Sequence, residues 1–499
     1  MIKIYDTKAR AKVDLNPIEF KQIRMYVCGP TVYNYIHIGN ARTFISFDMI
    51  RRYLEYRKFD VVYVSNITDV DDKIIKKANE EGRSAEEVAK EYTRAFIRDM
   101  HAVNVKDPTV RPKATQEIGP MIKLVEELIA AGHAYEVEGD VYFDVRSYDG
   151  YGELSGRNID EMESGHRELR AGAEVEDRKH DPLDFAVWKA AKPGEPSWDS
   201  PWGKGRPGWH LECSAMARKY LGLPFDIHGG GADLCFPHHE NERAQAEAVT
   251  GSTFAAHWMH SGMLQINSEK MSKSLGNFLL LRDVLKTTDP AVLRFLMLQT
   301  HYRSPLDFSE ERLAEAKVAL GRIKNAMNNI DWAGRHADGP NAALDADRVE
   351  EMIRTLRMKF FVAMDDDFNT PKAVGEIFDY ITEVNAMIDG VALGDPDMLV
   401  AAKLRNIVLE LMDVMGIDMA KYDPSAQGDE YPQELVALAA ELAGFEGDDG
   451  AAAADALLAA RAEARANKNW AVADAIRDRL GEIGFAVEDT AQGQRVVRR

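Results

Sequence analysis

The stretch formed by residues 25–40 constrains the fold more than any other part of the chain. Its apolar residues 25–27 predict a strand that ends at Cys28, and a helical period begins at Gly39 and Asn40. A second strand-like run, 61–67, follows that helix. Strand, loop, helix and strand form a βαβ unit, whose ligands bind at the carboxyl end of the first strand. That end here brings together a thiol, a histidine and a helix amino terminus.

Length and composition place the chain among multidomain globular proteins. Its 499 residues are too many for one core and predict about three or four domains. The chain has no apolar run of about 18 residues and no apolar signal segment at its start, so we expect a cytoplasmic protein without a membrane span. Three cysteines cannot all pair, which fits a reducing compartment better than a disulfide scaffold.

Charge is distributed unevenly along the chain. The net charge of −20 argues against indiscriminate binding of nucleic acid, which needs a basic surface. Residues 457–499 hold eight Lys or Arg and six Asp or Glu, which leaves a charge of +2 there and −22 on the rest. The carboxyl end is therefore the part best suited to contact a polyanion.

Periodicity divides the chain into an α/β part and a helical part. We predict an α/β fold: a Rossmann-like parallel-sheet catalytic domain with an insertion, followed by an α-helical bundle and a small C-terminal α+β domain. The expected boundaries are 1–110 and 201–250 for the two halves of the sheet domain, 111–200 for the insertion, 251–315 for a region with the Lys270-Met271-Ser272-Lys273-Ser274 loop, 316–420 for the bundle, 421–434 for a linker and 435–499 for the terminal domain.

Two glycine-rich stretches admit a nucleotide-binding interpretation. Residues 203–208 match GxGxxG by letters, but no strand precedes them and Pro207 interrupts them, so we predict a loop. Residues 229–231 follow a predicted strand, which suits close approach of a flat ligand such as a purine; an oxyanion hole is the alternative. Pro237 occupies a favoured first helical position and predicts a helix from there to about residue 249.

Four dispersed residues have side chains suited to zinc. Cys28 lies at a strand end, Cys213 lies early in a helix, and His238 and Glu242 are four residues apart on one helical face. Two thiolates, an imidazole and a carboxylate match the ligands that zinc prefers. The alternatives are that Cys235 is a ligand instead, or that the cysteines are buried as small apolar residues.

A helix start and a lysine-containing loop are candidates for phosphate binding. His37 and Gly39 lie where unpaired N–H groups and the helix dipole favour an anion. Lys270 and Lys273 flank a serine-containing turn, which suits a mobile loop that brings positive charge to a transition state. A locally hydrogen-bonded histidine and a solvated turn are the alternative interpretations.

Together these motifs resemble those of the class I cysteinyl-tRNA synthetases over essentially the whole chain. The residues that carry the resemblance are Tyr26-Val27-Cys28-Gly29-Pro30-Thr31-Val32-Tyr33, His37-Ile38-Gly39-Asn40, Asn66-Ile67-Thr68-Asp69-Val70-Asp71-Asp72-Lys73, Gly208-Trp209-His210-Leu211-Glu212-Cys213-Ser214, His228-Gly229-Gly230-Gly231-Ala232-Asp233, Phe236-Pro237-His238-His239-Glu240-Asn241-Glu242 and Lys270-Met271-Ser272-Lys273-Ser274. The resemblance implies ATP-dependent ligation of L-cysteine to the 3′ end of tRNA(Cys) through cysteinyl-adenylate, by a monomer that holds one Zn²⁺ and uses Mg²⁺ with ATP. Asn40 departs from the family pattern, which usually reads His-Ile-Gly-His.

The resemblance also implies a role for particular residues. The metal ligands would be Cys28, Cys213, His238 and Glu242, which leaves Cys235 outside the set. The other implied roles are catalysis by His37, Asn40, Lys270 and Lys273; ATP binding by His37, Gly39, Asn40, His228, Gly229, Gly230, Gly231, Asp233 and Lys273; cysteine binding by Gly29, Thr68 and Trp209; and contact with the tRNA anticodon by Arg465, Trp470, Asp474 and Asp489. Region 251–315 would contact the tRNA stem. For Trp470 the alternative is a place in the core of the small domain.

Two other functions are compatible with parts of the pattern. A cysteine:amino-sugar ligase of thiol biosynthesis would share the zinc site but end after the helical domain, so the terminal unit disfavours it. A catalytically inactive zinc protein that binds RNA would need neither His37 nor the Lys270 to Ser274 loop. A charging assay with each acceptor, together with a pyrophosphate-exchange assay, separates the three functions.

Overall fold

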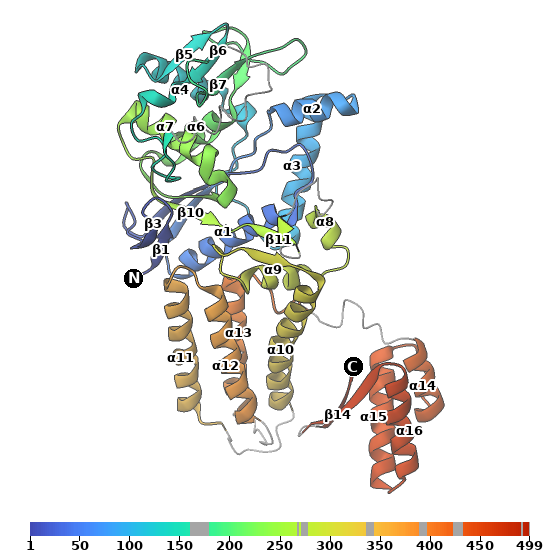
Figure 1. The fold of residues 1–499 in the computed structure, drawn as a ribbon. Coiled ribbons are helices and arrows are strands. Elements are labelled where there is room, and N and C mark those ends of the chain that lie inside the picture. The colour runs from blue at the N-terminus through green and yellow to red at the C-terminus, as the bar shows by residue number, and fades with distance from the viewer. Residues whose placement is uncertain are drawn as a thin grey trace. The chain divides into compact units, whose positions relative to one another are not determined.

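The computed structural model of the protein describes residues 1–159, 179–266, 269–270, 278–335, 344–388, 397–422, 433–490 and 493–498 (Figure 1). The chain divides into two compact units. The first consists of Met1–Ala316, Met358–Gly375 and Met412–Ile417, and the second of Lys317–Arg357, Glu376–Leu411 and Asp418–Arg499. The residues predicted for chemistry on the amino acid and ATP all belong to the first unit, although Lys273 is outside the described residues.

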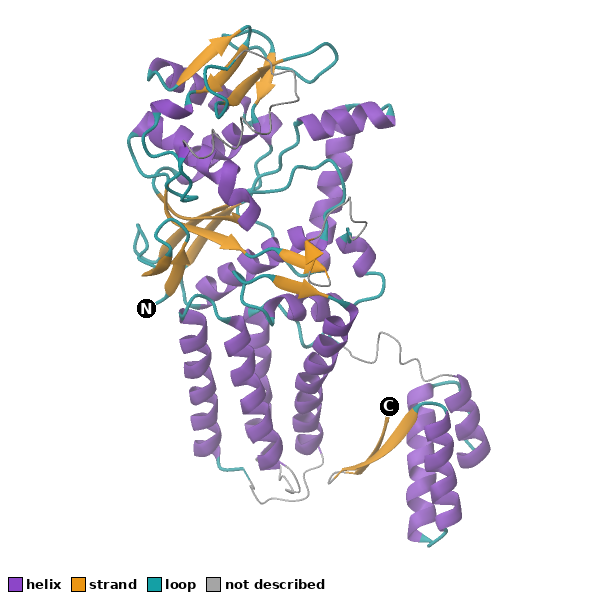
Figure 2. Ribbon diagram, in the orientation of Figure 1, coloured by secondary structure: helices purple, strands orange, loops and turns teal. Residues whose placement is uncertain are grey.

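A four-stranded parallel sheet lies at the centre of the first unit (Figure 2). In the order β10-β9-β3-β4 its strands are Ala255–Ser261, Phe225–Gly231, Gln22–Val27 and Asp60–Val64. Helix α1 (Ile38–Tyr56) connects β3 to β4 and buries Phe47 and Ile50. The predicted α/β class and the predicted βαβ unit are therefore confirmed.

The carboxyl ends of β3 and β9 lie side by side in this sheet. Tyr26 pairs with His228, Val27 pairs with Gly229, and the Cys28 N–H donates to the Gly229 carbonyl at 3.1 Å. Cys28 consequently stands one residue beyond the end of β3, at the edge where ligands of open parallel sheets bind. The register of the sheet thus places the thiol at the expected site.

The insertion contains an antiparallel sheet in the order β5-β6-β7-β8. Its strands are Ala134–Val137, Asp140–Phe143, Phe185–Ala190 and Gly205–Pro207, and helix α4 (Ile118–Ala130) precedes them. Strand β8 falls within residues 203–208, so the predicted loop is wrong there. Three residues are too few to show a strand period in the sequence, and their pairing with β7 decides their conformation.

Helices α6 (Trp209–Leu221) and α7 (Glu240–Thr250) follow the insertion. The second helix begins later than predicted, because Cys235–His239 form an irregular turn. Phe236 is extended in that turn, with φ −143° and ψ 132°, since a residue before proline avoids the helical region. His238 therefore lies in the turn before α7, whereas Glu242 lies in its first turn.

The remaining elements of the first 310 residues are short strands, helices and turns. They are β1 (Lys3–Asp6), β2 (Ala11–Asp14), α2 (Asp72–Glu81), α3 (Ala85–Ala102), η1 (Ala114–Gln116), η2 (Val145–Ser147), η3 (Ala232–Leu234), β11 (Leu264–Ile266), β12 (Glu269–Lys270), α8 (Leu281–Val284), α9 (Pro290–Leu298) and β13 (Leu306–Phe308). Strand β11 pairs with both β12 and β13, which forms a third small sheet.

The rest of the chain is mainly helical, as the predicted bundle and terminal domain require. The long helices are α10 (Glu310–Arg335), α11 (Ala346–Asp365), α12 (Thr370–Ile388) and α13 (Asp397–Val414). The terminal elements are α14 (Gln433–Ala443), α15 (Gly450–Ala466), α16 (Trp470–Glu482), β14 (Phe485–Thr490) and β15 (Gly493–Arg498). Leu435, Leu438, Leu457 and Ile476 give the terminal elements a core of their own. No helix among the described residues has the length and apolarity needed to cross a bilayer.

Candidate active site

The four predicted metal ligands converge at the end of the sheet. One donor atom from each of Cys28, Cys213, His238 and Glu242 lies within 4.8 Å of the others, and all four residues are buried. The two sulfur atoms are 3.6 Å apart, Cys28 Sγ is 3.2 Å from Glu242 Oε1, and that oxygen is 2.8 Å from His238 Nε2. Side chains from a strand end, a helix, a turn and a second helix therefore meet at one point.

The chemistry and spacing of this set fit zinc. In a tetrahedral site with Zn–S bonds of about 2.3 Å, two sulfur ligands stand about 3.8 Å apart. The observed sulfur separation of 3.6 Å is close to that value. Cys235 belongs to neither possible donor group found among the described residues, so the rival ligand is not supported.

Two further histidines hold the donor set in place. His228 Nε2 is 2.7 Å from Glu242 Oε2, while its Nδ1 is 3.0 Å from the Tyr26 carbonyl oxygen. His210 Nδ1 lies 2.9 Å from His238 Nδ1 and so orients the ring of that ligand. His228 and His239 also form a second possible donor group with Cys28 and Glu242. His228 has no exposed surface and does not line the cavity described below, where an ATP contact was expected.

Electrostatic interactions within the set favour a charged carboxylate beside charged imidazole. Burial alone would raise the pKa of Glu242, but His238 and His228 hold it well below its usual range. Burial alone would lower the pKa of His238, but Glu242 and Cys213 raise it to about 10. For Cys213, burial is opposed by hydrogen bonds with Cys28 and His238, which lower its pKa to about 7. A divalent cation bound by this set would displace these protons.

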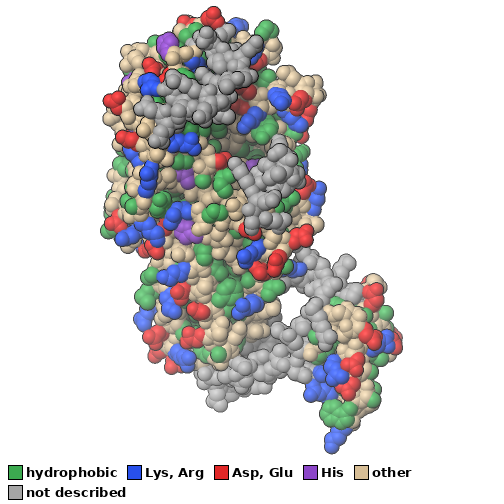
Figure 3. Space-filling view, viewed as in Figure 1, with side chains coloured by type: hydrophobic (Ala, Val, Ile, Leu, Met, Phe, Trp, Pro, Cys, Tyr) green, Lys and Arg blue, Asp and Glu red, His purple; other side chains and the backbone are tan. Residues whose placement is uncertain are grey.

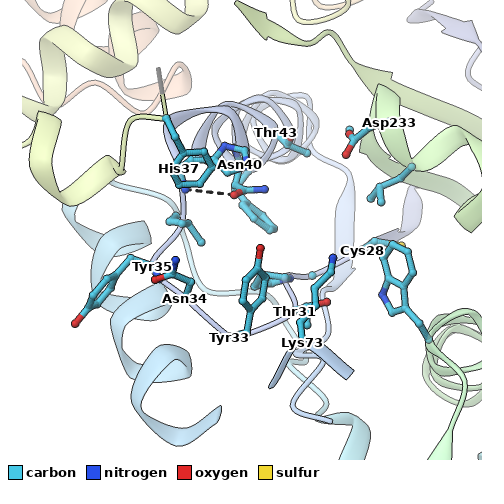
Figure 4. Close-up of a pocket in the computed structure, with 18 residues that line it drawn as sticks. Cys28, Thr31, Tyr33, Asn34, Tyr35, His37, Asn40, Thr43, Lys73 and Asp233 are labelled. Atoms are coloured by element: carbon cyan, nitrogen blue, oxygen red, sulfur yellow. Dashed lines mark hydrogen bonds between the residues drawn. The ribbon is translucent and has the colours of Figure 1, made fainter. Parts of the chain in front are cut away.

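A cavity of about 240 Å³ opens beside the donor set (Figure 4). It is lined by residues from the loop after β3, the starts of α1, α2 and α6, the end of β9 with the turn after it, and the segment before α8. They include Cys28, Gly29, Thr31, Tyr33, His37, Asn40, Thr43, Lys73, Trp209, Gly231, Asp233 and Phe278. Cys28 therefore belongs both to the cavity wall and to the donor set.

The start of α1 borders this cavity with a reciprocal pair of hydrogen bonds. The Asn40 N–H donates to His37 Nδ1 at 3.2 Å, and the His37 N–H donates to Asn40 Oδ1 at 3.3 Å. This capping box fixes the orientation of both side chains. Figure 4 shows the two residues next to each other at the helix start. The His37 ring also contacts the Phe278 ring, with centroids 5.1 Å apart.

Lys73 is a cavity residue that the sequence did not single out for a role. Its Nζ is 5.6 Å from the centre of the Tyr33 ring and 5.9 Å from that of Trp209. Figure 4 shows the ammonium group directed into the cavity. A single lysine in a helix start gives no recognisable pattern, because only the fold brings α2 to the loop after β3.

The three glycines at the end of β9 serve packing as well as the cavity. A Cβ at Gly229 would lie 2.3 Å from the Phe47 ring, and one at Gly230 would lie 2.8 Å from the His239 ring. Neither residue lines the cavity, although both were expected to contact ATP. Gly231 and Asp233 do line it, and Gly231 is close to the Asp233 carboxylate.

The residues predicted to bind cysteine are divided between the cavity and its support. Gly29 and Trp209 line the cavity, and the Trp209 ring stacks on His238 with centroids 4.0 Å apart. Thr68 is buried and donates to Glu212 Oε2 at 2.6 Å. Burial raises the pKa of Glu212 well above its usual range. Thr68 thus supports the wall of the cavity without lining it.

The lysine-containing loop is only partly described. Lys270 belongs to β12, which pairs with β11, and its side chain is outside the described part. Lys273 lies outside the described residues altogether. The predicted contribution of the two lysines therefore stays a prediction.

The anticodon candidates lie in the terminal domain. Trp470 is 57% exposed at the start of α16, so the alternative of a core role is wrong. Arg465 and Asp474 are also exposed, and Asp474 pairs with Arg477 at 3.0 Å. Asp489 belongs to β14, but its side chain is outside the described part.

Three family models match the chain in succession. Residues 14–318 match the class I (C) catalytic domain of tRNA synthetases, and residues 359–420 match the DALR domain. Residues 447–496 match the cysteinyl-tRNA ligase anticodon binding domain. The catalytic-domain match alone spans more than half of the chain.

Curated relatives are similar along almost the full length. A cysteine–tRNA ligase of Fusobacterium nucleatum is 47% identical over 495 residues, which is 98% of each chain. One of Geobacillus thermodenitrificans is 47% identical over 496 residues, covering 99% of this chain and 98% of the relative.

Solved structures share the fold at low sequence identity. Methionyl-tRNA synthetase of Mycobacterium tuberculosis, in complex with methionyl-adenylate, is 15% identical with a TM-score of 0.56, covering 84% of this chain and 94% of the other. The leucyl-tRNA synthetase of Agrobacterium radiobacter, in a ternary complex, is 12% identical with a TM-score of 0.58, covering 84% of this chain and 86% of the other.

Proposed function

The chain belongs to the class I cysteinyl-tRNA synthetase family, and on that premise we propose that its buried donor set binds one zinc ion that selects the substrate by its thiol. The chain ligates L-cysteine to the 3′ end of tRNA(Cys) in two steps, through cysteinyl-adenylate. The observation that carries the zinc proposal is the position of Cys28, which is shared by the donor set and the cavity wall.

The donor set explains amino-acid choice. When bound there, zinc would stabilise the thiolate of cysteine, a contact that the hydroxyl of serine cannot match. A site built around such a contact rejects the analogue that lacks it by orders of magnitude without an editing reaction. The ring of Trp209, fixed by its stack on His238, closes the side of a pocket for a small side chain. Gly29 lines that pocket from the loop after β3, and Thr68 supports its wall from the loop after β4.

The start of α1 is positioned to bind phosphate. Its dipole favours an anion, and the capping box leaves the His37 ring beside the cavity. In the first step, the carboxylate of cysteine attacks the α-phosphorus of ATP, and the enzyme mainly positions groups and neutralises charge. His37, Asn40, Lys270 and Lys273 would do so, with Mg²⁺ accompanying ATP. Gly39, Gly231 and Asp233 would contact the nucleotide.

The terminal domain is proposed to bind the anticodon. Unstacked bases of RNA stack on aromatic side chains and pair with polar groups. Trp470 and Arg465 are exposed and suited to this, and Asp474 and Asp489 would contact base edges. The match of residues 447–496 to an anticodon-binding domain favours tRNA over an amino sugar as acceptor. We further propose that the enzyme acts as a cytoplasmic monomer, which light scattering of the purified chain tests.

The zinc proposal is tested with Cys213→Ser and Glu242→Gln, and with Cys235→Ser as the matched control. We expect both ligand variants to lose zinc, measured by elemental analysis, because each removes a donor from the set. We expect the preference for cysteine over serine in pyrophosphate exchange to shrink at least about tenfold. Cys235→Ser should keep the metal and the preference. Full zinc content with unchanged preference in Cys213→Ser would refute the proposal.

A further inference from the structure

We propose that a second cavity, of about 420 Å³, binds a nucleotide. This cavity lies next to the loop after β4, which separates the cavity from the candidate active site. Such binding goes beyond the function proposed above and does not depend on zinc. The cavity lies between α3, the segment around η1 and the insertion, and it is larger than the cavity beside the donor set. Its size is within the range of pockets that bind small molecules, about 300–1,000 Å³.

The cavity has one aromatic wall and one wall of small side chains. Trp198 is partly buried and fixed to β8, since its N–H donates to the Gly205 carbonyl at 2.8 Å and its carbonyl accepts from the Gly205 N–H at 3.0 Å. Ala85 and Ala89, one helical turn apart on α3, also line the cavity. A rigid indole and a wall of small residues leave space for a flat ring, which favours stacking of a base.

Two lysines supply positive charge around this space. Lys90 lies on α3 and Lys113 precedes η1, and the lining also holds the carboxylates of Asp69 and Glu86. The backbone of Lys113 is held beside Ile67 as an extension of β4. The Asp69 carboxylate accepts from the Thr115 N–H at 2.9 Å and from the Thr115 hydroxyl at 2.7 Å, and it also attracts Lys113. A phosphate would therefore compete with Asp69 for Lys113, whereas Lys90 is exposed and forms no ion pair in the described part of the chain.

The two cavities share one loop. Asp69 and Val70 line the second cavity, whereas Thr68 supports the cysteine pocket and Lys73 lines the first cavity. A nucleotide in the second cavity is thus close to the reacting ends of the substrates. Its base and phosphate come from one of two sources with the same chemistry, the single-stranded end of tRNA or a free nucleotide.

The test uses the full chain with Trp198→Ala and Lys113→Met, and with Lys192→Met as the control, because Lys192 is exposed on the same insertion loop and does not line the cavity. A charging assay measures the KM for a full-length tRNA(Cys) transcript. A binding assay measures the dissociation constant of a transcript that lacks the single-stranded 3′ residues and so cannot be charged. Binding of AMP is measured by equilibrium dialysis with a non-hydrolysable adenylate analogue in the active site. Pyrophosphate exchange reports whether each variant is folded.

If tRNA is the source, Trp198→Ala should raise the KM for tRNA about 5- to 150-fold, and the truncated transcript should bind all variants equally. If a free nucleotide is the source, AMP binding should weaken by a similar factor while the KM for tRNA is unchanged. Lys113→Met should act in the same direction and become less effective at high salt. Pyrophosphate exchange should be retained throughout. Values for both variants within about twofold of wild type in both assays would overturn the proposal.

Discussion

Asn40 and His37 close the start of α1 by accepting hydrogen bonds from each other's backbone. Asparagine at this position therefore keeps a structural contact, and it can also donate to a phosphate oxygen. Two variants separate the roles. Asn40→Ala removes the acceptor and should weaken the helix start by about 1 kcal/mol, seen as faster hydrogen exchange of the first amides of α1. Asn40→Asp keeps the acceptor but adds a negative charge.

We expect Asn40→Asp to preserve hydrogen exchange and to reduce pyrophosphate exchange more than Asn40→Ala does, because like charges repel the phosphates of ATP. If Asn40→Ala reduced pyrophosphate exchange more than Asn40→Asp, Asn40 would act only through its hydrogen bond in the helix cap.

Lys73 stands between two aromatic rings at the cavity wall, where the negative charges of ATP and of the cysteine carboxylate would meet if the proposed function is correct. Lys73→Met should lower the kcat of pyrophosphate exchange about 10- to 100-fold, as expected when one preorganised charge is removed from a transition state. Zinc content should not change, since Lys73 is not in the donor set. Lys76→Met is the control, because Lys76 is 79% exposed on the same helix. If the Lys73→Met variant exchanged pyrophosphate at the wild-type rate, a contact between Lys73 and the reacting groups would be contradicted.

The residues on β9 show why part of the site was predictable and part was not. Successive side chains of a strand point to opposite faces. Gly229 and Gly231 face α1, where a Cβ would lie 2.3 Å from Phe47 and 3.6 Å from Thr43, while His228 faces Glu242 of α7 and Gly230 faces His239 in the turn before that helix. The sequence shows glycines and a histidine after a strand, which is enough to expect a site. It does not show which helix each one meets, so His228 was expected at ATP instead of at Glu242.

At the scale of elements, α1 and α9 are joined by a buried ion cluster. Asp48 on α1 is hydrogen-bonded to Arg294 of α9, to Arg52 Nε at 2.8 Å and to the Lys106 N–H at 2.8 Å. Burial alone would raise the pKa of Asp48, but Arg294 and Arg52 lower it below its ordinary value. The cluster therefore stabilises the fold above the pKa of an unfolded Asp, about 3.9, and loses this contribution as the pH falls through the folded pKa.

Asp48→Asn should lower the free energy of unfolding by about 3–5 kcal/mol at pH 7, because it leaves buried guanidinium groups without a counter-charge. Urea unfolding at several pH values measures this, and the difference from wild type should narrow below about pH 4. Asp413→Asn is the control: Asp413 is 75% exposed and 3.9 Å from Arg52, so its effect should be at most about 1 kcal/mol. Equal effects of the two variants would show that the buried contacts do not matter.

Long elements with a clear apolar periodicity were predictable from the sequence. Short elements whose conformation depends on neighbouring segments were not. The helices and the parallel strands follow from apolar periodicity, which reflects the face that each buries. Strand β8 and the turn over Cys235–His239 depend on pairing with β7 and on the extended residue before Pro237. The nearness of His238 to Cys28 could still be expected, since it required only that the chain return to Cys28.

At the scale of the whole molecule, the residues proposed for chemistry on the amino acid and those proposed for anticodon recognition belong to different units. The described candidates for catalysis lie in the first unit, and the terminal elements have their own core. Tyr422 is buried, and residues 433–490 and 493–498 include helices α14 to α16 and the paired strands β14 and β15. Ending the chain after Tyr422 should therefore leave the sheet domain folded.

Removal of residues 423–499 should leave cysteine-dependent pyrophosphate exchange within about twofold of the full chain, since no described cavity or donor residue is lost. Charging of tRNA(Cys) should fall by about 100-fold or more in kcat/KM, because the contacts that stack and pair anticodon bases are removed. Trp470→Ala in the full chain should reproduce part of this loss, about 5- to 150-fold, with normal exchange. If truncation reduced both activities equally, the terminal domain would support the catalytic fold, and its exposed tryptophan would need another explanation.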